Sequence, residues 1–146
     1  MKLSNVSLLL LRIAISYVWL TAGITKLLNG QFITTFPNTL ENFAKNSPYS
    51  FYSNFLHTYV MSHANIFAQL VTWGEILTGV AFLIGFPIAI ACISGIFMNI
   101  NYYLVANTTP SQFLNIILIF SQLVAYTNGA GAIWGLSTKT NLKFKS

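Results

Sequence analysis

Apolar residues gather in four long segments of the chain, and short polar stretches separate them. The segments cover residues 6–28, 66–86, 88–105 and 112–126. A helix needs about 20 mainly apolar residues to cross the hydrocarbon core of a bilayer. The fourth segment is the shortest of the four. The pattern therefore predicts an all-α integral membrane protein, a bundle of four transmembrane helices in a single domain over residues 1–146.

The longest stretch between predicted spans, about residues 29–65, is expected to form an external loop. Within it, Ser47 suits the N-cap and Pro48 the first position of a helix. Aromatic residues then recur at a spacing of four, at Phe51, Phe55 and Tyr59, and a weaker repeat lies upstream at Phe36, Leu40 and Phe43. This spacing predicts a short amphipathic helix on the membrane surface between the first and second spans.

Composition supports a membrane protein and argues against a soluble domain or a nucleic-acid-binding protein. Only 6% of the residues are charged, against about 25% in soluble domains, and none is charged between residues 76 and 138. A water-facing surface cannot be built from such a sequence, so membrane lipid is expected to surround it. The net charge of +5 does not indicate nucleic acid as a partner, because the basic residues are not clustered.

Basic residues beside the spans indicate the orientation in the membrane. Four of the seven lie at the chain ends, at Lys2, Lys139, Lys143 and Lys145. Cytoplasmic flanks carry an excess of Lys and Arg, so we expect a multi-pass plasma-membrane protein with both termini in the cytoplasm. A single cysteine, Cys92, and spans without histidine predict neither an internal disulfide nor a metal or haem site.

Charged residues inside the spans are the first candidates for chemistry. Glu75 lies near the middle of the second span, where an unpaired carboxylate is costly. Arg12, Trp19 and Lys26 are spaced by seven and share one stripe of the first span, which is expected to face the bundle interior or a partner. An ion pair between Arg12 and Glu75 is one prediction, and snorkelling of Arg12 or a direct ligand contact are the alternatives. Lys26, near the outer end, is expected to snorkel.

Amides and phenols gather at the outer end of the third span. They predict either a pocket for a quinone carbonyl or a polar substrate, or interhelical hydrogen bonds to which Asn115 and Gln122 of the fourth span contribute. Glu75 is interpreted as a proton relay or a partner of a quinone head group, or as half of a structural ion pair. The candidate catalytic residues are Glu75 and Arg12, the candidates for binding quinone or substrate are Lys26, Trp19, Asn99, Asn101 and Tyr102, and no metal ligand is proposed.

Three short motifs resemble a known family. They are Leu-Arg-Ile-Ala at residues 11–14 with Ala-Gly-Ile-Thr-Lys-Leu at 22–27, Gly-Glu-Ile-Leu-Thr-Gly at 74–79, and Met-Asn-Ile-Asn-Tyr at 98–102. The first two are similar to the DoxX/DoxD family of small four-helix membrane proteins, and the third to its DoxD branch. The tail after Gly131 departs from the family, because it has no acid where related chains often read Gly-x-x-Leu-Asp.

The resemblance implies a function that composition does not. DoxD is the small subunit of thiosulfate:quinone oxidoreductase in acidophilic archaea, which passes electrons from thiosulfate to the quinone pool of the respiratory chain. We therefore expect a non-autonomous membrane subunit with a larger redox subunit as partner and a quinone as its one cofactor, not covalently bound. The alternative is a structural accessory subunit packed against a terminal quinol oxidase or another respiratory complex. A small-solute carrier, working as a homo-oligomer, is the third hypothesis.

Overall fold

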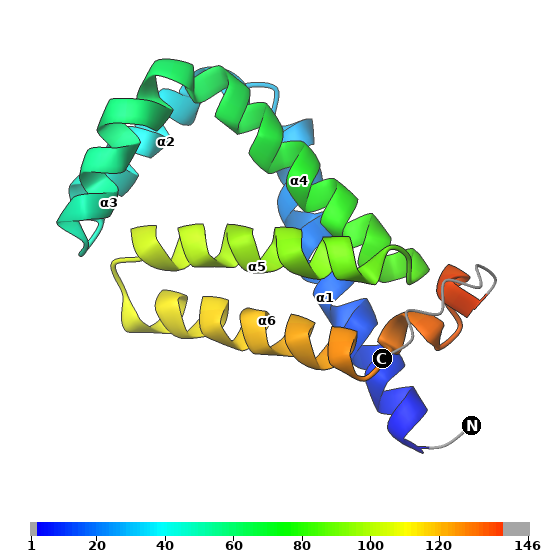
Figure 1. The fold of residues 1–146 in the computed structure, drawn as a ribbon. Helices are drawn as coiled ribbons and strands as arrows, with labels where there is room; N and C mark the ends of the chain where they lie inside the picture. Colours follow the sequence, from blue (N-terminus) through cyan, green and yellow to red (C-terminus); the bar gives the residue numbers. More distant parts are fainter. Residues whose placement is uncertain (1–2, 139–146) are drawn as a thin grey trace.

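The computed structural model describes residues 3–138, and that part of the chain is helical without strands. Four long helices form the body of the fold: α1 (Leu3–Leu28), α4 (Ala64–Ile84), α5 (Ile88–Val105) and α6 (Thr109–Thr127). Helix α1 packs along α4, α5 packs against both α4 and α6, and α6 closes against α1 (Figure 1). The predicted helical bundle is therefore confirmed.

Three helices are long and apolar enough to cross a membrane. They are Leu3–Leu28, the continuous helical stretch Ser50–Ile84, and Ile88–Val105. Helix α6 has 19 residues but does not reach the same mean hydropathy, because Gln112, Asn115 and Gln122 interrupt its apolar residues. The protein is thus a membrane protein with three such helices among residues 3–138, and the fourth span stays a prediction.

The segment predicted as an external loop is mostly helical. Helix α2 (Phe32–Asn46) and helix α3 (Ser50–Phe55) form a hairpin at the end of the bundle where α5 passes into α6 (Figure 1). A π-helical turn, η1 (Leu56–Val60), and a 3-10 turn, η2 (Met61–His63), join α3 to α4 without a break. The prediction of one short surface helix therefore understates the helical content of this segment. The helix that contains the second predicted span begins before residue 66.

Two apolar clusters explain this hairpin. The bundle has its own core, and a second cluster holds the hairpin against the start of α4, with buried Phe36, Leu40, Ala44, Tyr52, Leu56, Val60, Ala64 and Ala68. The weak repeat of apolar residues in α2 is thus the buried face of a helix. Ser47 also fastens the hairpin, because its hydroxyl donates to the carbonyl of Leu104 at 2.7 Å and accepts from the backbone N–H of Tyr49.

Candidate functional site

A buried carboxylate with two partners lies between three helices. Glu75 of α4 is 1% exposed. Lys26 of α1 donates to both of its oxygens, at 2.8 Å to Oε1 and 2.7 Å to Oε2. The hydroxyl of Tyr102, on α5, donates to Oε1 at 2.5 Å. An ammonium and a phenol thus compensate one carboxylate, as a charge in a membrane requires.

The prediction that Arg12 pairs with Glu75 is wrong. Fourteen residues separate Arg12 from Lys26, which is about 21 Å along a helix at 1.5 Å per residue. Glu75 lies level with the later part of α1, since a Cβ placed on Gly23 would be 3.1 Å from the Cβ of Glu75. Lys26 is therefore the cation within reach, and it does not act as the snorkelling anchor that its position suggested.

Arg12 has a different role at the opposite end of the bundle. Its side chain is buried, and its Nη1 donates to the carbonyls of Ala130 and Ile133, both at 2.9 Å. Arg12 therefore neither snorkels to the membrane surface nor pairs with Glu75, the two main predictions for it. The guanidinium instead fastens the segment after α6 to the start of α1.

We expect Arg12→Met to loosen this segment. The change removes two charge-assisted hydrogen bonds and leaves two carbonyls without their donor, which predicts a loss of about 2 kcal/mol. Limited chymotrypsin digestion in detergent should then cut at Trp134 faster than in the wild type. Arg12→Lys, which keeps a donor, should restore part of the protection, and equal digestion of all three proteins would contradict this role.

An apolar cavity of about 390 Å³ lies beside the Lys26–Glu75–Tyr102 cluster. Helix α2, helix α3, the turn η1, helix α4 and helix α5 all contribute to its walls. Most of the lining is aromatic or aliphatic, and the polar residues are Lys26, Thr39, Tyr52, Ser94, Asn101 and Tyr102. The cavity therefore combines an apolar interior with a few polar groups, which is typical of small-molecule sites.

Lys26 lines this cavity and has one N–H group that Glu75 does not use. An ammonium group has three N–H groups, and Glu75 accepts two hydrogen bonds from it. The third has no acceptor among residues 3–138. The Nζ atom also lies 5.8 Å from the ring centroid of Phe32 and 6.0 Å from that of Tyr102, so aromatic faces surround it.

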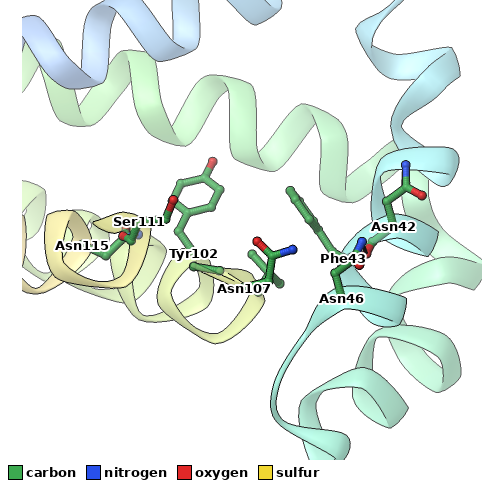
Figure 2. Close-up of a pocket in the computed structure, with 9 residues that line it drawn as sticks. Asn42, Phe43, Asn46, Tyr102, Asn107, Ser111 and Asn115 are labelled. Carbon is green, nitrogen blue, oxygen red and sulfur yellow. Dashed lines mark hydrogen bonds between the residues drawn. The ribbon is translucent and has the colours of Figure 1, made fainter. Parts of the chain in front are cut away.

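A second pocket of about 360 Å³, lined largely by polar side chains, also includes Tyr102. Figure 2 shows asparagines of α2 facing Asn107, with Ser111 and Asn115 of α6 beyond the ring of Tyr102. Phe43, Tyr102 and Val105 line both this pocket and the apolar cavity. The two pockets therefore adjoin at these side chains.

The other candidate residues divide into two groups. Asn101 lines the apolar cavity, where it accepts from the Tyr52 hydroxyl at 2.6 Å and donates to the carbonyl of Phe97. Trp19 and Asn99 are buried in the bundle instead and do not line this cavity. The stripe of Arg12, Trp19 and Lys26 faces inward as expected, but the three side chains have different surroundings. Arg12 binds the segment after α6, Trp19 is buried in the bundle, and Lys26 pairs with Glu75.

Sequence reasoning missed the part of the site that comes from the hairpin. Phe32, Phe36 and Leu40 of α2 line the cavity, with Tyr52 from α3. The signal was the spacing of four between Phe36 and Leu40, which was interpreted as a weak surface pattern. The amides of Asn115 and Gln122 also differ from expectation, since their N–H groups donate to carbonyls of α6 itself.

Comparison with known proteins places the chain in one family. None of the curated proteins or solved structures matches it. The family model DoxX matches residues 7–108, a range that includes both charged partners Lys26 and Glu75 as well as Tyr102. This match extends over more than half of the 146 residues, so the chain belongs to the DoxX family.

Proposed function

We propose that this chain is a non-autonomous subunit of a quinone-linked membrane oxidoreductase and binds a quinone in the apolar cavity. The observation that carries the proposal is the Lys26–Glu75–Tyr102 cluster, in which Lys26 and Tyr102 line that cavity. The resemblance to DoxD favours the thiosulfate:quinone type, with electrons supplied through a partner subunit. Terminal oxidase subunits are the other partners that we consider.

The proposed binding mode follows from the donors and the shape of the cavity. A quinone carbonyl is an acceptor, and the third N–H of Lys26 is a donor beside the cavity. The aromatic and aliphatic walls suit a flat ring and an isoprenoid chain. An ammonium beside the carbonyl stabilises the negative charge that develops on its oxygen as electrons arrive.

The proposed chemistry needs two electrons and two protons for each quinone. Two thiosulfate ions each lose one electron and join through a new S–S bond to form tetrathionate. The quinone accepts both electrons, and each of its oxygens takes a proton. Glu75 is the proposed proton acceptor and donor in this step, because its carboxylate is held by two hydrogen-bond donors beside the cavity.

We also propose the complete topology. Helix α6 lies along α5 and reaches α1, so four antiparallel neighbours would cross the bilayer if α6 inserts with them. The Lys residues at the two chain ends favour cytoplasmic termini in a plasma membrane, with the hairpin outside. Labelling of single cysteines introduced at Asn107 and Asn128 from each side tests this arrangement.

Filling the cavity tests quinone binding directly. Val71 lines the cavity on α4, whereas Leu77 on the same helix is 64% exposed and does not line it. We expect Val71→Trp to lower the retention of a quinone analogue by the purified chain in nanodiscs about tenfold, a change of roughly 1.4 kcal/mol. Leu77→Trp should retain it as the wild type does. Equal retention by both variants would exclude the cavity.

Glu75→Gln separates this proposal from a structural accessory role. The fully paired carboxylate favours the accessory role as the second candidate, because such clusters also fix helix packing. In the quinone-linked proposal, Glu75→Gln should abolish quinone reduction by the complex that has assembled, so turnover is compared with the wild type per assembled complex. Turnover close to that of the wild type would instead support the accessory role.

A further inference from the structure

Three buried polar atoms in the middle of the bundle have no hydrogen-bond partner within the described range. They are Nε1 of Trp19 on α1, Nδ2 of Asn99 on α5 and Oε1 of Gln122 on α6. The three residues are 2%, 1% and 0% exposed. Polar groups inside a membrane protein need partners, because lipid offers none.

Two of the three atoms lie next to Gly95, and the third belongs to a residue one turn further along the same helix. A Cβ placed on Gly95 would overlap Oε1 of Gln122 and lie 3.3 Å from Nε1 of Trp19. Asn99 follows Gly95 by four residues on α5, so its side chain projects from the same face of that helix. The amide of Gln122 on α6 thus fills the space that the missing side chain of Gly95 leaves, with the indole of Trp19 on α1 beside it and Asn99 on the same face of α5.

The donors and acceptors define what can bind there. Trp19 and Asn99 offer N–H donors. Gln122 offers an acceptor, since its Nε2 already donates to the carbonyl of Leu118 at 2.9 Å. A bare cation would face two donors, and an anion would face the amide oxygen. A quinone head group, which only accepts, would leave Gln122 without a partner.

We propose that Trp19, Asn99 and Gln122 form a binding site for one buried water molecule. The water accepts from the indole of Trp19 and the amide of Asn99, and it donates to Oε1 of Gln122. This assignment gives all three buried atoms a partner, as is usual for internal waters. It stands on different residues from the quinone cavity and does not depend on the proposed function.

The water site explains how α6 is held in the bundle. Gln122 and Ala125 are the buried residues of α6, and this helix is the least apolar of the four long helices. A water shared with α1 and α5 supplies the polar attachment that its apolar residues do not. Gly95 leaves room for the amide of Gln122 to approach Trp19.

Nuclear magnetic resonance of the full chain in nanodiscs tests the site. With indole and amide ¹⁵N labels, we expect cross-peaks between a long-lived water and the Trp19 indole proton, and likewise for the Asn99 side-chain amide. Gln122→Leu should remove both cross-peaks. Gln112→Leu is the matched control on the same helix, because Gln112 donates to the carbonyl of Ala106, between α5 and α6, and it should leave them unchanged.

The wild-type spectrum alone can overturn the proposal, so the test survives a variant that fails to fold. A direct coupling across a hydrogen bond from the Trp19 indole to the Gln122 carbonyl, without a water cross-peak, would show that the two side chains bond to each other. Water cross-peaks that persist in Gln122→Leu would place the water elsewhere and would equally overturn the site.

Discussion

Replacement of Lys26 by methionine should cost about 3–5 kcal/mol of stability, because it leaves the carboxylate of Glu75 buried without its cation. Glu75 is 1% exposed and both of its oxygens accept from Lys26. Tyr102 alone would then compensate the charge. The double variant Lys26→Met with Glu75→Leu should recover much of the loss, since it removes both charges together. Unfolding in a graded series of denaturing detergent measures all three proteins.

Lys45 provides the matched control for Lys26. It forms an ion pair with Glu41 at 3.1 Å, but the two side chains are 65% and 39% exposed. Exposed pairs contribute about 1 kcal/mol at most, so Lys45→Met should unfold almost as the wild type does. If Lys26→Met and Lys45→Met had equal effects, or if the double variant were as unstable as Lys26→Met, the buried pair would not be what holds α1 to α4.

Gly79→Val should destabilise the bundle by about 3 kcal/mol, because α1 and α4 approach too closely for a side chain at this position. A Cβ there would lie 2.7 Å from Cγ and 2.8 Å from the backbone nitrogen of Leu20. The approach is reciprocal, since a Cβ on Gly23 of α1 would lie 2.9 Å from the backbone nitrogen of Ile76 on α4. Backbone atoms cannot yield as a flexible side chain can, so the helices must separate.

The separation should also disturb the charged cluster. Lys26 and Glu75 lie next to the Gly23 contact, and their hydrogen bonds depend on this spacing. Gly30→Val is the control, because a Cβ at Gly30 meets nothing within 4 Å. The same unfolding series measures both variants. A loss of stability in Gly30→Val equal to that in Gly79→Val would show that the effect comes from glycine itself and not from helix packing.

Much of the fold follows from local sequence patterns. The predicted third span, residues 88–105, coincides with α5, and the predicted first span lies within α1. Pro87 lies between α4 and α5, and residues 106–108 separate α5 from α6, which carries Pro110 in its first turn. These boundaries were predictable because helix formation and helix breaking depend on neighbouring residues.

The hairpin and the ion pair were not predictable in the same way. Residues 29–65 contain too few apolar residues in a row to predict a packed element, and they become one only against the start of α4. A spacing of seven correctly placed Arg12 and Lys26 on the inner face of α1. It could not decide which of them meets Glu75, because periodicity fixes the face of a helix and not its axial position relative to a neighbour.

The sequence by itself determined that this is an α-helical membrane protein, because a chain with so few charges can only be solvated by lipid. It also determined which residues are the costly polar groups inside the bundle. Only the tertiary structure decided that Lys26 and Tyr102 are the partners of Glu75, that Arg12 fastens the segment after α6, and that an apolar cavity lies beside the cluster. These features join residues from separate helices, so they depend on how the helices pack.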